Sequence, residues 1–118
     1  MLKIYGIPNC DTTKKTQNWF QKAGMAVPLH DYKKDGIDAG TLKQWIREAG
    51  LDIILNKRST TWRELSAADQ ARANNPAQVI DLLQTHTSLI KRPIITQNGK
   101  IVAVGYHEPA FQQLLEKQ

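Results

Sequence analysis

The sequence is poor in cysteine, because Cys10 is the only one among its 118 residues. A lone cysteine excludes an internal disulfide framework and is typical of a protein from a reducing compartment. No stretch approaches the ~18 consecutive apolar residues of a membrane-spanning helix, and the first residues lack the apolar core of a secretory signal. We therefore expect a cytoplasmic protein with no membrane partner.

Other chemistry-bearing patterns are also missing. There is no glycine-rich phosphate loop, paired-carboxylate motif or zinc pattern, and His30, His86 and His107 have neither metal nor catalytic spacing. We therefore expect no metal and no bound cofactor.

The sequence is basic. Lys and Arg outnumber Asp and Glu by 16 to 11, for a formal net charge of +5. That excess indicates either a solvated basic surface, an anionic ligand or an acidic protein partner. Nucleic acid ranks last, since no RNP-like or zinc-finger pattern is present.

Apolar spacing and turn residues predict the secondary structure. The first helix would bury Thr16, Trp19, Phe20 and Ala23, and Gly24 would end it. The first predicted elements are a strand over Leu2–Tyr5, a helix over Asp11–Ala23, an edge or irregular strand over Ala26–Tyr32 and a loop over Lys33–Asp38. The middle of the chain is predicted to contain a helix that Thr41 and Gln44 cap and Gly50 ends, a short helix and loop over 51–66, a short helix capped by Ser66 and a helix that begins at Asn75-Pro76. A hairpin over Ile94–Val104 and a last helix from Glu108 complete the predicted order.

The order of these elements predicts an α/β fold. The first strand–helix–strand unit favours a parallel pair, whereas the hairpin at Asn98-Gly99 adds antiparallel strands. The length of 118 residues fits one domain over 1–118. We expect a thioredoxin-like mixed sheet flanked by helices, with a helical insertion at roughly 38–88 between its two halves.

Cys10 lies where the first turn meets the first helix, in the stretch GIPNCDTTKK. Unpaired N–H groups and the positive dipole end of a helix N-terminus favour a thiolate, and Lys14 and Lys15 follow closely. A thiolate there would be a nucleophile. The alternative is a small buried hydrophobe, which is the common role of a free cysteine.

Two arginines could hold an anion beside such a thiolate. Arg58 lies in the polar stretch NKRSTTW, and Arg92 directly precedes Pro93. Arginine binds planar or tetrahedral oxyanions through paired N–H donors, so these arginines and Lys14 could hold the carboxylates of glutathione or a small anionic substrate. The alternative for each arginine is an ordinary solvated surface position.

Three stretches carry a family resemblance: YGIPNCDTTKK, NKRSTTWREL and IKRPII with the following GKIVAVGY. Together they resemble the arsenate-reductase-like (ArsC) family, which includes the Spx-type transcriptional regulators. Within it the chain most resembles the small YffB-type branch, described as a glutathione-dependent thiol reductase. The resemblance implies a thioredoxin-like sheet, a cis proline at Pro93, a nucleophile at Cys10 and anion-binding residues at Arg58 and Arg92.

The sequence departs from both better-known branches. It reads Gly105-Tyr106-His107 where arsenate reductases carry Gly-Arg-Pro, so one arginine of the oxyanion cradle is missing. Thr13 stands where Spx-type regulators often have a second cysteine, although GYHE resembles the regulators.

Three functions stay open on this basis. The first is a monothiol oxidoreductase with glutathione as co-substrate, which could act on a protein disulfide partner. The second is an arsenate reductase coupled to glutathione and glutaredoxin. The third is a non-enzymatic, Spx-like protein that binds a partner such as RNA polymerase.

Overall fold

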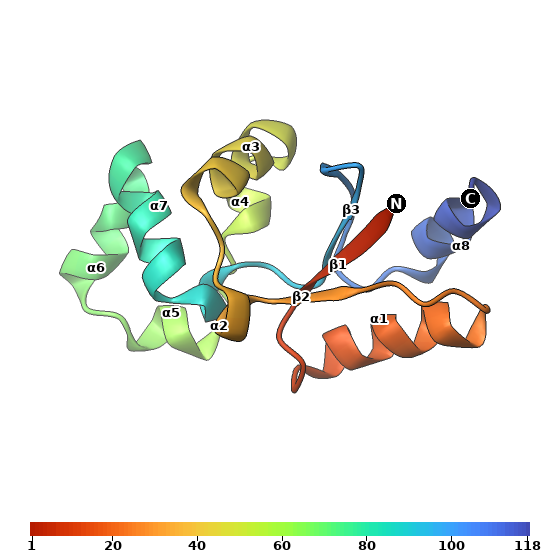
Figure 1. Cartoon of the computed structure of the whole chain (residues 1–118). Coiled ribbons are helices and arrows are strands. Elements are labelled where there is room, and N and C mark those ends of the chain that lie inside the picture. The colour runs from red at the N-terminus through yellow and green to blue at the C-terminus, as the bar shows by residue number, and fades with distance from the viewer. The chain divides into compact units, whose positions relative to one another are not determined.

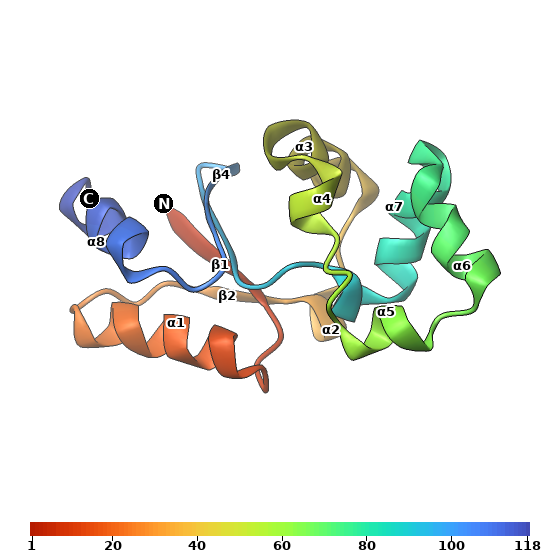
Figure 2. The same ribbon diagram turned by 180° about the vertical axis from the view of Figure 1, so that it is seen from behind.

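The computed structural model describes residues 1–118, which divide into two compact units. The sheet unit consists of Met1–Asp35 and Arg92–Gln118, and the helical unit is the continuous segment Gly36–Lys91 (Figures 1 and 2). The chain therefore leaves the sheet unit after its second strand and returns to it before its third. No helix is both long and apolar enough to cross a membrane.

The sheet unit contains four strands, which confirms the predicted mixed sheet. Strand order is β2-β1-β3-β4, with β1 parallel to β2 and antiparallel to β3, and β3 antiparallel to β4. Strand β2 lies at an edge, as Pro28 indicates. The elements of this unit are β1 (Leu2–Gly6), α1 (Asp11–Lys22), β2 (Leu29–Asp31), α2 (Tyr32–Asp35), β3 (Ile94–Gln97), β4 (Lys100–Val104) and α8 (Glu108–Glu116).

The β3–β4 hairpin forms as its Asn-Gly pair predicts. Gln97 pairs with Lys100, so the loop has two residues. Asn98 has φ 52° and Gly99 has φ 85°, and both values lie in the left-handed region that a type I′ turn requires.

Helices α1 and α8 cover the same face of the sheet. Leu2, Ile4 and Ile95 of the sheet form one buried cluster with Phe20 of α1 and with Phe111 and Leu114 of α8. The rings of Phe20 and Phe111 lie 5.2 Å apart between centroids, which joins the two helices directly.

The buried face of α1 differs in part from the prediction. Thr16 and Phe20 are buried as expected, but Trp19 is half-buried and Ala23 is exposed. Thr13, which the apolar pattern did not include, is fully buried. The buried face of α1 therefore extends to the first turn of the helix, close to Cys10.

The helical unit has a core of its own. Trp45 and Leu42 of its first helix are buried, as are Val79, Ile80 and Leu83 of its longest later helix. The elements of this unit are α3 (Ala39–Ala49), α4 (Leu51–Ile54), α5 (Thr60–Glu64), α6 (Ala67–Ala71), η1 (Arg72–Asn74), α7 (Pro76–Thr85) and η2 (Thr87–Leu89).

Three local predictions were wrong. The cap of α3 is Asp38 rather than the Thr41–Gln44 pair: its carboxylate accepts from the Thr41 amide at 2.9 Å and from the Thr41 hydroxyl at 2.7 Å. These bonds lower the pKa of Asp38.

Two segments that were expected to be loops contain short helices. The expected loop over Lys33–Asp38 begins inside the short helix α2, and the expected loop before Ser66 contains α5. Ser59 caps α5 by accepting from the Trp62 amide, a signal that was overlooked.

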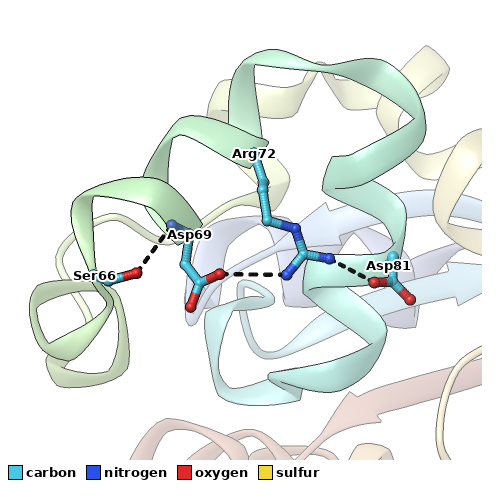
Figure 3. A network of polar contacts seen from close by, with 4 residues as sticks. All are labelled: Ser66, Asp69, Arg72 and Asp81. Carbon is cyan, nitrogen blue, oxygen red and sulfur yellow. Dashed lines mark hydrogen bonds and ion pairs between the residues drawn. The ribbon is translucent and has the colours of Figure 1, made fainter.

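A polar network holds α6, η1 and α7 together (Figure 3). Ser66 caps α6 by accepting from the Asp69 amide at 3.1 Å. The Arg72 guanidinium forms ion pairs with Asp69 and, on α7, with Asp81. Arg72 thereby fixes the corner at which the chain reverses into α7.

We expect Arg72→Gln to lower the free energy of unfolding by about 0.5–1 kcal/mol, the scale of a solvent-exposed ion pair. The value is modest because the Asp81 side chain is 69% exposed. Urea denaturation at low and high salt would measure it, and the effect should shrink in high salt. Lys43→Gln, an exposed cation of the same unit, is the control. A salt-independent loss would show that Arg72 acts through packing instead.

Candidate active site

Cys10 is the N-cap residue of α1, at the end of the turn that follows β1. Its amide donates to the Ile7 carbonyl at 3.0 Å, and its own carbonyl accepts from the Lys14 amide at 2.9 Å. Its side chain forms no capping hydrogen bond and is half-exposed. The sulfur therefore stands at the positive end of a 12-residue helix, within reach of solvent.

Several donors converge on the sulfur. Burial alone raises the pKa of Cys10, but the Thr12 hydroxyl, the Thr13 amide and the Arg92 side chain donate to the sulfur and lower the pKa from 9.0 to about 6. The Thr12 oxygen lies 3.1 Å from the sulfur. Because the donors outweigh desolvation, Cys10 is mostly a thiolate at neutral pH.

Gly6 allows α1 to begin against the end of β1. A Cβ on Gly6 would stand 2.5 Å from the Thr13 hydroxyl, closer than any real contact, and Thr13 itself is fully buried. Thr13 cannot swing aside into solvent from that position. The missing Cβ of Gly6 therefore leaves room for the Thr13 side chain in the first helical turn, whose Thr13 amide faces Cys10.

Arg92 reaches the sulfur from the other part of the sheet unit. The Arg92–Pro93 peptide bond is cis, as the family resemblance implies. Pro93 is buried, and its carbonyl accepts from the Gly105 amide at 2.8 Å. The half-buried Arg92 also interacts electrostatically with the buried phenol of Tyr32. Burial raises the pKa of Tyr32, so this phenol stays neutral beside the guanidinium.

The other two expected anion ligands are Lys14 and Arg58. Lys14 is exposed in the first turn of α1. Arg58 belongs to the helical unit, where it is exposed; its amide donates to the Asn56 side chain at 3.1 Å and its carbonyl accepts from Arg63 at 2.8 Å. The role of each as an anion ligand stays a prediction. No three His, Cys, Asp or Glu side chains lie together as metal ligands would.

Tyr106, in the position of the missing arginine, is partly exposed. Its ring packs edge-on against Phe111, with centroids 5.4 Å apart. Partial desolvation and the Glu108 carboxylate, which accepts its hydrogen bond, raise its pKa. This position thus carries a neutral donor, the Tyr106 hydroxyl, which already donates its hydrogen bond to the Glu108 carboxylate.

Three residues of the site had been overlooked in the sequence. Thr12 and Thr13 lie two and three residues after Cys10, in the first turn of the helix that Cys10 caps. Hydroxyl and amide donors of a first helical turn point back at the N-cap, so the pair was a readable signal. Tyr32 had no such signal, because its proximity to Arg92 depends on the fold.

The geometry agrees with the comparison with known proteins. The profile of the ArsC family matches residues 5–114. The chain belongs to the ArsC family. Its sheet unit has the thioredoxin-like, arsenate-reductase-like fold of that family.

Two curated relatives and one solved structure are similar over nearly their whole length. An uncharacterized protein of Haemophilus influenzae is 41% identical over 95% of this chain and 96% of its own. The global transcriptional regulator Spx 2 of Oceanobacillus iheyensis is 31% identical over 99% of this chain and 85% of its own. A YffB protein superposes with a TM-score of 0.88 at 36% identity, over 98% of this chain and 99% of its own.

We expect Gly6→Ala to lower the free energy of unfolding by about 1–3 kcal/mol, the usual cost of overpacking. It should also raise the pKa of Cys10, because the clash pushes Thr13 and its amide away from the sulfur. Gly40→Ala is the matched control, since its Cβ would come no nearer than 3.2 Å to the Asp38 carboxylate. An unchanged Cys10 pKa in a destabilised Gly6→Ala protein would contradict the positioning argument.

The rate of alkylation of Cys10 against pH should have a midpoint at about 6. Since the folded pKa lies below the ordinary value of 9.0, the free energy of unfolding should rise as pH rises from about 6 to about 9. Thr12→Val should shift the alkylation midpoint upward, and Cys10→Ser should remove this part of the pH dependence of stability. A midpoint near 9 in the unmodified protein would refute the thiolate.

Proposed function

We propose that the protein is a monothiol oxidoreductase, a glutathione-dependent thiol/disulfide reductase with Cys10 as its nucleophile. The observation that carries the proposal is the lowered pKa of Cys10 at a helix N-terminus, with Thr12, Thr13 and Arg92 as donors to its sulfur. Membership of the ArsC family and the likeness to a YffB protein support the same chemistry. A glutathione-based cycle fits a reducing compartment such as the cytoplasm.

The cycle has two thiol–disulfide exchanges. The Cys10 thiolate attacks the glutathione sulfur of a mixed disulfide, the substrate thiolate leaves and takes up a proton, and Cys10 becomes bound to glutathione. A second glutathione, as its thiolate, then attacks the glutathione sulfur of the disulfide with Cys10. Oxidised glutathione leaves, and the Cys10 thiolate is restored. The second thiol comes from outside because the chain has no other cysteine.

The residues around Cys10 have distinct tasks in this cycle. Thr12 and the Thr13 amide stabilise the thiolate before attack and again when it leaves. The Arg92 guanidinium supplies a paired donor for a carboxylate of glutathione. Lys14 and Arg58 are our further candidates for carboxylate ligands.

A regulatory function is the second candidate, because the Spx 2 relative is 31% identical over 99% of this chain. In that case Cys10 would serve as a redox sensor and the protein would bind a partner such as RNA polymerase. Arsenate reduction ranks below both, because Tyr106 is a neutral donor where that chemistry would use a charged one.

The deciding experiment is turnover of a glutathionylated model peptide with reduced glutathione and glutathione reductase. We expect turnover that depends on Cys10, is lost in Cys10→Ser and exceeds any reduction of arsenate. A thiolate that forms a glutathione adduct without turnover would favour the regulatory function. Robust reduction of arsenate with glutathione and glutaredoxin supplied would overturn the proposed ranking.

We expect Arg92→Ala to lower kcat/KM for the same peptide by roughly ten-fold to a hundred-fold, the scale of one charged hydrogen bond. Arg92→Lys should recover only part of the loss, because lysine keeps the charge without the paired donors. Arg47→Ala, at an exposed arginine of α3, is the control. Full activity of Arg92→Lys would show that Arg92 acts only through its positive charge and not through paired donors.

A further inference from the structure

A groove of about 430 Å³ lies between α1 and the turn that joins β4 to α8. It belongs entirely to the sheet unit, and Cys10 is not among its lining residues. Its volume falls within the usual range for small-ligand sites. The lining residues are Lys15, Asn18, Trp19, Lys22, Tyr106 and Glu108.

The walls of the groove are anchored to the core. Its four α1 residues stand at positions i, i+3, i+4 and i+7 counted from Lys15, so they share one face of the helix. The rings of Trp19 and Tyr106 both contact the buried Phe111, with centroid distances of 5.6 Å and 5.4 Å. The two aromatic walls therefore belong to the same packed cluster.

The charges in the groove form a definite pattern. Lys15 and Lys22 are seven residues apart on α1, which corresponds to about 10.5 Å along the helix axis. Glu108 lies in the opposite wall, where its carboxylate accepts the hydrogen bond of the Tyr106 hydroxyl. The groove thus presents two ammonium groups, one carboxylate and the amide of Asn18.

We propose that this groove binds a short free peptide that has a carboxylate at each end and an ammonium group at one of them. Three residues of extended chain span roughly 10 Å, which matches the separation of the two lysines. The carboxylates pair with Lys15 and Lys22, and the ammonium group pairs with Glu108. A purely acidic peptide is the poorer fit, because Glu108 would repel it.

Binding in this groove needs no bond to Cys10 and goes beyond the proposed thiol chemistry. Glutathione is one member of this ligand class, so a probe without a thiol keeps the two questions apart. The tripeptide Glu-Gly-Gly has the required charges and no sulfur. Its binding to a Cys10→Ser protein, which cannot turn over a disulfide, reports on the groove alone.

The test is a titration of the full-length ¹⁵N-labelled Cys10→Ser protein with Glu-Gly-Gly, followed by amide and indole resonances. We expect saturable shifts at the Trp19 indole and at the Lys15 and Lys22 amides, with weak affinity because the charges are exposed. The indole of the buried Trp45, in the helical unit, is the internal control. Absence of shifts along α1 would overturn the proposal.

Charge-removal variants test the assignment of each group. Lys15→Gln, Lys22→Gln and Glu108→Gln should each weaken binding about two-fold to five-fold, the scale of one exposed ion pair, whereas Lys100→Gln should not. N-acetyl-Glu-Gly-Gly should bind the Cys10→Ser protein more weakly and should be insensitive to Glu108→Gln. Tighter binding after Glu108→Gln would mean that the groove selects acidic rather than zwitterionic peptides, and would overturn the proposal.

Discussion

The close approach of Thr13 to Gly6 is the constraint on which the rest of the site depends. Only a residue without a Cβ allows the first turn of α1 to lie against the end of β1. That contact buries Thr13 and presents its amide to Cys10, while Thr12 places its hydroxyl on the sulfur. A side chain added at the buried Gly6 of β1 would thus change the pKa of Cys10, which lies four residues further along the chain.

Strand pairing supplies the remaining donor. Strands β1 and β3 are antiparallel and Tyr5 pairs with Ile94, so the end of β1 lies beside the start of β3. Cys10 follows the first of these ends and Arg92 precedes the second, which brings together residues from opposite ends of the chain. Burial by itself would leave Cys10 an inert thiol; the combined donors of α1 and Arg92 reverse that effect.

How much could be predicted depended on the range of the interaction. The Asn98-Gly99 turn and the Asn75 and Ser66 caps are local hydrogen-bond problems, and the sequence predicted them correctly. The cap of α3 was misassigned because Asp38 and Thr41 are both capable of it, and only the backbone geometry decides. In the site, Cys10 and Arg92 were predicted to lie together, and the Arg92 side chain does donate to the Cys10 sulfur. Their roles as nucleophile and anion ligand stay predictions. Tyr32 could not be predicted as a residue of the site, because its place beside Arg92 arises from packing between distant segments.

Tyr106 connects the catalytic question with the groove. A charged arginine at this position would serve a tetrahedral oxyanion, whereas tyrosine offers a single neutral donor, and Glu108 already accepts its hydrogen bond. The ring instead packs on Phe111 and forms a wall of the groove along α1. The same substitution that weakens the case for an inorganic oxyanion therefore builds a surface suited to a peptide. Both effects favour an extended organic anion over a compact inorganic one as the ligand of this protein.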